Sequence, residues 1–334
     1  MKLKKGKIDH ELLEALLAGK IHSGGRIIIG SSIGEDTAVI DMGEKYLLAK
    51  TDPITHAGNR IGYYAVNVNA NDIAAMGGIP LWFLATVLMP IGSTEDELKL
   101  IFEQLADTCN FLNIGWCGGH TEVTSAVEHP VVIGQMLGEA EKYELKPSRG
   151  ALAEDLILIT KTAAIEGTAI MALEGNDNFH SNIDVNLLEK ARKYLDYPGI
   201  SVLKESLLIK NIKEVHALHD PTEGGIATGI WEMATASNLG VTIYEKDIPI
   251  TEETKALSKS FGINPLGTFA SGSLLIAVSK AGSEEVVAKL SAENIPVTCI
   301  GKMTSKDNGM ILVTDKGNCP LPIFSQDELS RIFG

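Results

Sequence analysis

Apolar runs alternate with polar, glycine-containing turns in the first half of the chain, which predicts a mixed α/β unit. The run 81–89 is apolar throughout and is typical of a strand buried on both faces. The Ala-rich segment 58–76 predicts a helix, because Gly77 and Gly78 follow it and Pro80 stands just beyond. The other elements expected here are a helix at 9–19, strands at 26–29, 37–41 and 46–51, a helix at 93–112 capped by Ser93, and a strand at 131–138.

Strand and helix patterns also alternate in the second half of the chain. The polar stretch 143–154 is interpreted as a linker, so the expected domains are 1–148 and 149–334. The polar segment 174–184 is interpreted as a mobile loop. Expected elements are strands at 156–160, 215–218, 274–278 and 297–300, and helices at 165–173, 224–237 and 283–293. The predicted fold class is therefore α/β with two domains.

Composition narrows the class of protein. Lys and Arg number 29 against 43 Asp and Glu, a net charge of −14, which argues against a nucleic-acid partner. No apolar run is long enough for a membrane span, and the basic N-terminus lacks the apolar core of a secretory signal. Four cysteines without CxxC spacing do not predict a disulfide scaffold. We therefore expect a cytoplasmic protein with no membrane and no nucleic-acid partner.

Candidate chemistry lies in acidic residues beside glycines near strand ends. Carboxylate oxygens are the ligands that Mg²⁺ prefers, and Mg²⁺ usually arrives with substrate phosphates. Glycine-rich turns that enter a helix offer backbone N–H groups to such phosphates. The alternative is that Asp and Asn beside Gly only form turns, which is weaker for Asp72 because it stands inside a predicted helix. The positions concerned are Asp36, Asp52, Asp72, Glu122 and Asp220.

The segment Gly118–Glu122 holds two further candidate groups. His120 and Glu122 could bind a transition metal, but without an HxxxH or CxxC companion a zinc site is not expected. Cys117 could be a nucleophile, and a small buried thiol is the favoured interpretation.

Seven segments together resemble the aminoimidazole ribonucleotide (AIR) synthase superfamily, in the order found there. This superfamily includes AIR synthase, the formylglycinamidine synthetase core, thiamine-monophosphate kinase, selenophosphate synthetase and the hydrogenase-maturation protein HypE. The IEGTAI and DPT-x-GG segments are most similar to the HypE branch and to AIR synthase-related proteins. The segments are GEDTAV at 34–39, TD at 51–52, AVNVNANDIAAMGGIP at 65–80, GGHTE at 118–122, IEGTAI at 165–170, HDPTEGG at 219–225 and SGSLLIAV at 271–278.

The resemblance implies a two-domain PurM-like fold. The N-terminal α/β domain would form a β-barrel with that of a second copy, giving a homodimer, and a C-terminal α/β domain would follow. ATP and Mg²⁺ would lie in the cleft between the domains. The implied metal ligands are Asp36, Asp52, Asp72, Glu122 and Asp220, and the implied catalytic residues are Asp72, His120 and Asp220. The implied nucleotide-binding residues are Gly34, Asp36, Asn71, Gly118, Gly119, Thr121, Thr222, Gly224 and Gly225.

Two departures from the family pattern bear on the reaction. His120 stands where many members carry an acid, which leaves two alternatives: Glu122 is the substitute ligand, or this ligand is absent. HypE ends in Pro-Arg-x-Cys, whereas this sequence ends in Gly334 and its last cysteine is Cys319, so whether the HypE reaction is possible is left open. Selenophosphate synthesis is disfavoured because no cysteine precedes Cys109.

Three functions follow from the resemblance. The first is an ATP- and Mg²⁺-dependent enzyme that phosphorylates a carbonyl, amide or hydroxyl oxygen of a small molecule or amide substrate. The second is a small-molecule kinase resembling thiamine-monophosphate kinase. The third is a nucleotide-binding scaffold that docks a hydrogenase-maturation partner protein. Several acidic groups in one cleft repel one another without a cation, which favours the two enzymes.

Overall fold

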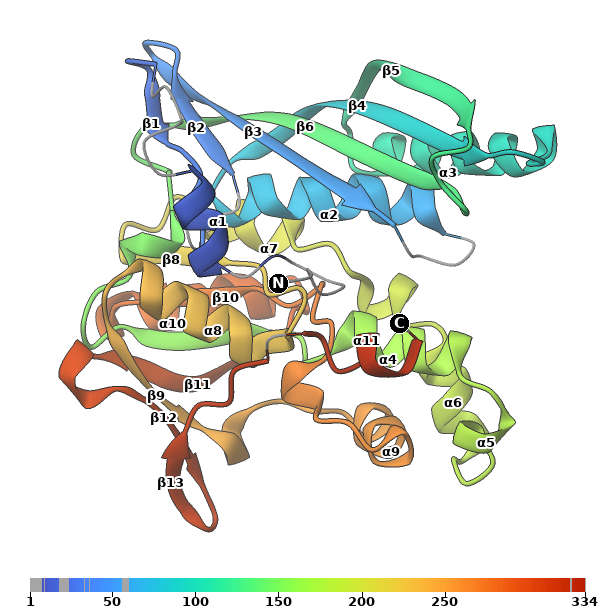
Figure 1. Ribbon diagram of the computed structural model, residues 1–334. Helices are drawn as coiled ribbons and strands as arrows, with labels where there is room; N and C mark the ends of the chain where they lie inside the picture. The colour runs from blue at the N-terminus through green and yellow to red at the C-terminus, as the bar shows by residue number, and fades with distance from the viewer. Residues whose placement is uncertain are drawn as a thin grey trace.

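The protein contains two β-sheets in the part of the chain that the structure describes (Figure 1). The computed structural model describes residues 8, 10–17, 24–32, 34–35, 37–55, 60–324 and 326–333. One sheet is built from the first half of the chain and the other from the second half. The expected α/β class with two sheet-based halves is confirmed.

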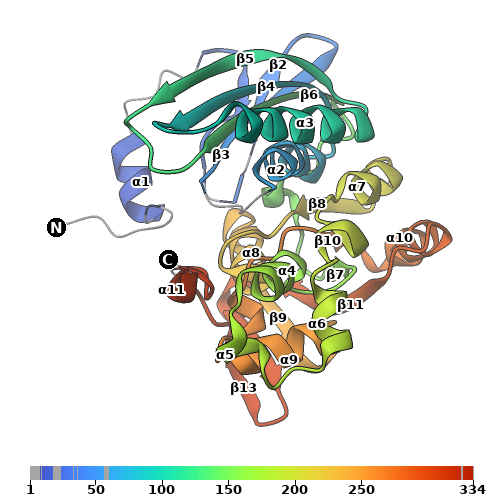
Figure 2. The ribbon, with the colours of Figure 1, turned by 90° about the vertical axis from the view of Figure 1, so that its right-hand side faces the viewer.

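The first sheet has six strands in the order β1-β2-β3-β6-β4-β5. All neighbours are antiparallel except β4 and β5, which run parallel. Helices α2 and α3 cover one face of this sheet (Figure 2). The bounds are α1 His10–Leu17, β1 Ile27–Ile29, β2 Ala38–Asp41, β3 Lys45–Ile54, α2 Ile61–Ala75, β4 Ile79–Pro90, α3 Glu95–Phe111, β5 Gly115–Thr124 and β6 Val131–Glu141.

Strand β4 alternates between buried and partly exposed residues. Phe83, Ala85 and Val87 pack against the helices, whereas Trp82 on the opposite face is 38% exposed. The prediction that 81–89 is buried on both faces is therefore wrong for a single chain. Among the described residues no helix covers this second face of the sheet (Figure 2).

Helix α2 is buried along nearly its whole length. Ile73 packs into the core of the first sheet, while Ala75 packs with Leu218 and Leu274 of the second half. Within the first half, α2 also packs closely on α3, because a Cβ on Gly62 would clash with the backbone of Ile101. Helix α2 is therefore buried between the two halves although it carries polar residues, and Asn69, Asn71 and Asp72 are buried with polar partners.

The second sheet has seven strands in the order β13-β12-β9-β11-β7-β10-β8. Helix α8 packs on one face, and α7 and α10 pack on the other. The bounds are β7 Leu156–Thr160, α4 Ile165–Glu174, α5 Asp177–His180, α6 Val185–Ala191, α7 Leu203–Ile209, β8 Val215–His219, α8 Gly225–Ala236, β9 Gly240–Tyr244, α9 Glu252–Phe261, β10 Leu275–Val278, α10 Lys280–Ala292, β11 Val297–Thr304, β12 Met310–Thr314, β13 Gly317–Pro320 and α11 Ser330–Phe333.

The polar segment 174–184 contains helix α5 rather than only a loop. The Asn176 side chain caps this helix, and Phe179 stacks on Phe261 of α9 with ring centroids 4.0 Å apart. The polar composition concealed one aromatic anchor, which fixes the segment to its neighbour.

Two further boundaries differ from the sequence predictions. Asp52 lies inside β3 rather than after it, because β3 continues through Pro53. Proline is tolerated there since, in the part of the chain that the structure describes, β2 pairs only with 46–49 and leaves that side of β3 without a ladder at Pro53. Thr94, not Ser93, caps α3 and forms a capping box with Glu97.

Strand β5 was not predicted, because two consecutive glycines, Gly118 and Gly119, are typical of a turn. The reason for the glycine is steric: Gly119 has φ +151°, and a Cβ there would overlap the backbone of Ala85 in β4. The described residues include no helix long and apolar enough to cross a membrane.

Candidate functional site

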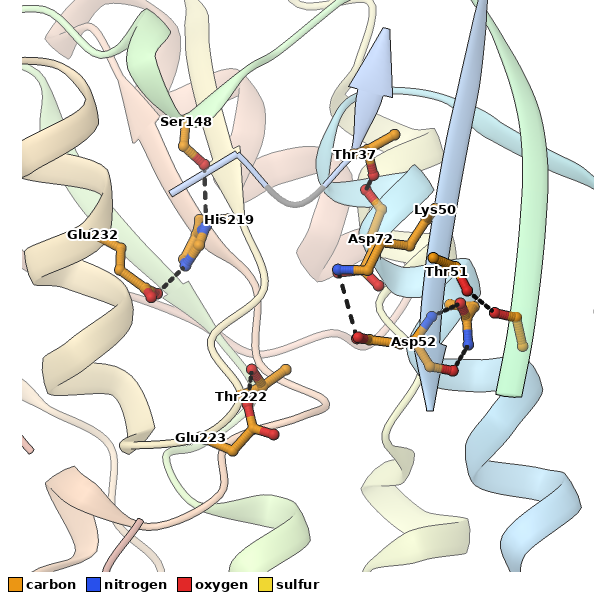
Figure 3. A network of polar contacts seen from close by, with 12 residues as sticks. Thr37, Lys50, Thr51, Asp52, Asp72, Ser148, His219, Thr222, Glu223 and Glu232 are labelled. Atoms are coloured by element: carbon orange, nitrogen blue, oxygen red, sulfur yellow. Dashed lines mark hydrogen bonds and ion pairs between the residues drawn. The ribbon is translucent and has the colours of Figure 1, made fainter. Parts of the chain in front are cut away.

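Asp52 and Asp72 converge on one cation, the ammonium group of Lys50 (Figure 3). Lys50 Nζ lies 3.5 Å from Asp52 Oδ2 and 3.4 Å from Asp72 Oδ1. The Asp72 side chain is only 4% exposed, whereas that of Asp52 is 39% exposed. One carboxylate is thus fixed inside the protein and the other reaches solvent.

The alternation of side chains along β3 explains why Lys50 and Asp52 lie on the same face of the sheet. Leu48, Lys50, Asp52 and Ile54 alternate along β3, so their side chains share one face, and Leu48 and Ile54 pack into the core beneath α2. Asp72 on α2 faces the charged pair between them. Two charged residues therefore interrupt an otherwise apolar face.

Hydrogen bonds hold the backbone around both carboxylates. The Asp52 N–H donates to Asn69 Oδ1 at 2.9 Å, so α2 fixes this point of β3. A Cβ at Gly134, opposite Asp52 on β6, would clash with the Asn69 amide. Thr37 Oγ1 donates to the Asp72 carbonyl at 3.1 Å. The carboxylate positions are set by main-chain contacts as well as by charge.

Asn71 joins the two halves of the chain. Its Nδ2 donates to the Ile200 carbonyl at 2.7 Å, and its Oδ1 accepts from the Val202 N–H at 2.9 Å. Asn71 is 1% exposed. The structure thus gives Asn71 a connecting role, and its predicted contact with nucleotide stays a prediction.

Asp220 is buried directly after β8, with 3% of its surface exposed. Thr222 and Glu223 follow in the turn, and Thr222 Oγ1 donates to Glu223 Oε2 at 3.0 Å. The turn carrying Thr222 and Glu223 appears with Asp52 and Asp72 in Figure 3. Because Ala75 lies one turn after Asp72 and packs against Leu218 of β8, this side of α2 faces the strand that leads to Asp220.

His219 lies between two polar residues, Ser148 and Glu232 (Figure 3). Its Nδ1 lies 3.0 Å from Ser148 Oγ, and its Nε2 lies 3.1 Å from Glu232 Oε2 on α8. Ser148 and His219 are each 2% exposed. Ser148 and Glu232 thus fix the orientation of the buried His219 side chain, and His219 directly precedes Asp220.

The Gly224–Gly225 pair begins helix α8. Gly224 has φ +76° and Gly225 has φ +67°, backbone conformations that favour glycine. The Gly224 N–H donates to Asp327 Oδ2 at 3.0 Å. The Gly224 N–H, which the sequence predicted to bind nucleotide, thus donates to a carboxylate from the C-terminal segment.

Two buried carboxyl groups near this turn have raised pKa values. Burial raises the pKa of Glu166 to about 7, against the opposing effect of hydrogen bonds from Ser271, and the charge of Glu223 raises it further. Burial likewise raises the pKa of Asp327 to about 8, although the N–H groups of Leu329 and Gly224 favour its charged form. A carboxyl group with a pKa near 7 can accept or donate a proton at neutral pH.

His120, Thr121 and Glu122 lie on the edge strand β5 and are exposed. His120 Nε2 is 3.2 Å from Glu122 Oε2. The strand register aligns Asp52 with Gly134, Ala85 and Gly119 in turn. Three strand spacings separate Asp52 from Gly119, about 14 Å, so within one chain this segment lies away from the Asp52–Asp72 pair.

Cys117 is also exposed on β5, so its interpretation as a buried thiol is wrong. The edge position explains this, since β5 has a neighbour on only one side among the described strands.

Gly34 and Asp36 belong to the segment before β2. Gly34 has φ +72°, and a Cβ there would press on the Glu232 carbonyl of α8, so this segment packs on α8. Asp36 lies outside the described residues.

Sequence reasoning missed three residues: Lys50, Glu166 and Asp327. For Lys50 a signal was available, namely a charge at an inward position of an alternating strand. Glu166 lies inside a segment used only for resemblance, and Asp327 gave no signal, because only the folded tail brings it to Gly224.

The described residues include no group of three or more His, Cys, Asp or Glu arranged to hold a metal ion, but the pair Asp52 and Asp72 supplies carboxylates of the kind that Mg²⁺ prefers. Asp52 and Asp72 present hard carboxylate oxygens to a common point, and the Lys50 ammonium shows that this point stabilises positive charge.

Comparison with known proteins bears on both halves of the chain. The family model described as AIR synthase related protein, N-terminal domain, matches residues 34–140, and the corresponding C-terminal domain model matches residues 153–313.

Three curated relatives resemble the chain over most of its length. A Methanocaldococcus jannaschii protein, provisionally named hydrogenase expression/formation protein, is 27% identical and covers 98% of this chain and 97% of its own. The carbamoyl dehydratase HypE of Rhizobium leguminosarum is 26% identical, covering 79% of this chain and 74% of its own. The thiamine-monophosphate kinase of Bacillus subtilis is 28% identical and covers 77% of each.

Solved structures share the fold. Escherichia coli HypE has a TM-score of 0.75 at 22% identity, covering 93% of this chain and 96% of its own. A HypE structure in complex with ATP has a TM-score of 0.73 at 20% identity, covering 92% and 90%. HypE from a HypE–HypF complex has a TM-score of 0.73 at 21% identity, covering 87% and 93%.

Proposed function

Since this chain belongs to the AIR synthase-related proteins, we propose that it is an ATP- and Mg²⁺-dependent enzyme that phosphorylates an oxygen of its substrate. The acceptor is a carbonyl, amide or hydroxyl oxygen. The convergence of Asp52 and Asp72 on one positive charge carries the proposal. A related fold has been solved with ATP, in HypE, which supports the choice of nucleotide.

Each part of the site has a role in this proposal. Asp52, Asp72 and Asp220 hold Mg²⁺, with Asp36 as a further ligand. Bound Mg²⁺ supplies charge neutralisation on phosphate oxygens, which is the main requirement of phosphoryl transfer. Residues Asn71 and Thr222 and the glycines Gly34, Gly224 and Gly225 shape the nucleotide site. Asp72 and Asp220 orient the reacting groups.

A homodimer would complete the site. The uncovered face of the first sheet presents Trp82 and other partly exposed residues of β4, and β5 is an open edge. Pairing these surfaces with a second copy closes a barrel and brings the partner's Gly118–Glu122 segment to the nucleotide. His120 then acts on substrate, and Glu122 serves as a metal ligand.

Hydrogenase maturation is the proposed setting. One relative is named for hydrogenase formation, and HypE has been solved with the partner HypF. We therefore propose a maturation protein as partner and a cytoplasmic location. We also propose a domain boundary between residues 148 and 149.

The alternative function is a small-molecule kinase, which the similarity to thiamine-monophosphate kinase favours. Product analysis separates the two enzymes. A kinase yields ADP and a phosphorylated product, whereas a dehydratase or ligase yields ADP and free phosphate. A scaffold would bind nucleotide and the maturation partner without turnover.

The Asp72→Asn variant tests the nucleotide site. This substitution keeps the shape of the side chain and removes its charge. We expect the variant to fold and to lose most of the thermal stabilisation by Mg-ATP that the wild type shows, about 2.7 kcal/mol at a hundredfold excess over Kd. Asp107→Asn on the exposed side of α3 is the control and should keep the full shift. The proposal fails if the wild type shows no shift, or if Asp72→Asn and Asp220→Asn both keep it.

A further inference from the structure

Lys50 is a lysine enclosed among acidic groups on the inward face of β3. Its side chain is 14% exposed, and its ammonium contacts Asp52 and Asp72 at 3.5 and 3.4 Å. A lysine on an inward strand position is costly unless its charge is compensated, and these carboxylates compensate it. The Lys50 side chain therefore contributes through its charge rather than through apolar packing.

The ammonium stands at the point where the two carboxylates would share a divalent cation. A Mg²⁺ ion directed to the same oxygens meets a positive charge already present. Like charges at this range repel strongly, and the low exposure of Lys50 and Asp72 limits screening by salt. This repulsion falls when the Lys50 ammonium moves toward another anion.

Resting on the proposed function, we propose that Lys50 is a positioning residue that makes metal binding conditional on a polyphosphate. In the free protein Lys50 neutralises Asp52 and Asp72 and keeps the site preformed. When a nucleoside triphosphate binds, its phosphate oxygens accept hydrogen bonds from the Lys50 ammonium. The two carboxylates then become available to Mg²⁺. The site thus selects the metal–nucleotide complex over free metal.

The consequence is a coupling between two ligands. By linkage, the factor by which nucleotide strengthens metal binding equals the factor by which metal strengthens nucleotide binding. Removing the Lys50 charge should reduce this factor from both sides, because free metal gains the carboxylates while the phosphates lose a cation.

Calorimetric titration of the full-length protein tests the proposal. The three titrations use MnCl₂ alone, ATP in EDTA, and Mg-ATP. In Lys50→Met we expect MnCl₂ alone to bind about tenfold more tightly than in wild type, and ATP in EDTA about tenfold more weakly. Lys50→Arg keeps the charge and should retain weak binding of metal alone.

Lys45→Met is the matched control. Lys45 is on the same strand and is also paired with two carboxylates, Glu139 and Glu141, but it is exposed and lies outside the site. It should match the wild type in all three titrations. Lys50→Gln is the second neutral variant if Lys50→Met does not fold, as judged by circular dichroism.

The outcomes separate this proposal from the proposed function. If the neutral Lys50 variants bind free MnCl₂ and metal-free ATP as the wild type does, the role of Lys50 is wrong while the nucleotide site stands. The same conclusion holds if Lys50→Arg gains affinity for free metal. If the wild type binds neither metal nor Mg-ATP, the proposed function itself fails.

Discussion

The Asp327 carboxylate accepts a hydrogen bond from the Gly224 N–H at 3.0 Å, across 103 residues of sequence. The C-terminal segment thereby reaches the turn that begins α8. Asp327 also accepts from the Leu329 N–H at 2.9 Å, so the carboxyl group is held from both sides.

Glu166 and Asp327 should each make a contribution to protein stability that is lost as the pH rises, because their pKa values are raised to about 7 and about 8. Their ordinary values are 4.5 and 3.8, so between about pH 4 and pH 8 these two groups bind more protons in the folded state than in the unfolded state. Their contribution to the free energy of unfolding then decreases with pH across this window. Urea denaturation at a series of pH values measures the slope.

The Asp327→Asn variant should show a flatter pH profile than the wild type, because the side chain can no longer ionise. Asp107→Asn, at an exposed carboxyl on α3, should keep the wild-type slope. Equal slopes for Asp327→Asn and wild type would show that Asp327 does not contribute.

Replacing Asn71 should weaken the connection between the two halves of the chain. Asn71→Ala leaves the Ile200 carbonyl and the Val202 N–H without their bond from α2. We expect a loss of about 2 kcal/mol in the free energy of unfolding, in the range for buried polar groups that lose a partner. Chemical denaturation measures it, and a loss no greater than that of an exposed substitution would contradict the connecting role.

The uncovered face of the first sheet should be a dimer interface. Light scattering at micromolar concentration should give a dimer for the wild type and a monomer for Trp82→Arg, which places a charge on this face. Phe111→Arg is the control, because Phe111 is 86% exposed at the end of α3 on the helical side. A monomeric wild type would overturn the prediction.

Removing 330–334 should leave nucleotide binding intact. The deletion takes away Phe333, which packs near Phe261 with ring centroids 5.8 Å apart, and spares Asp327 and buried Leu329. We expect a stability loss of about 1–2 kcal/mol from lost apolar contact. The thermal shift with Mg-ATP should persist, and its disappearance would show that the tail completes the site.

Local pattern predicted the elements whose signal is local. The apolar run of β4, the glycine stop of α2 and the periodic spacing of α3 all lie where the sequence indicates. Strand β5 escaped prediction because Gly118 and Gly119 meet a steric demand from β4, and that demand exists only after the sheet forms.

The residues of the candidate site also fall into two groups, those that local sequence predicts and those that only the folded chain brings together. Asp52 and Asp72 are recognisable by residue type and spacing, and the structure brings them to one cation. The approach of Asp327 to Gly224 depends on how the last residues fold back, which no local pattern encodes.

Asn71 and Asp72 are consecutive in α2, yet one is bonded to Ile200 and Val202 while the other contacts Lys50 on β3. A helix advances about 100° per residue, so neighbours in sequence reach different surroundings. A slide or rotation of α2 that moves Asp72 must also pull on the backbone at 200–202. The position of the carboxylate is thus coupled to the backbone at 200–202 and, through it, to the second half of the chain. Occupancy of the site would be measurable remotely, as a distance between spectroscopic labels on β6 and β12.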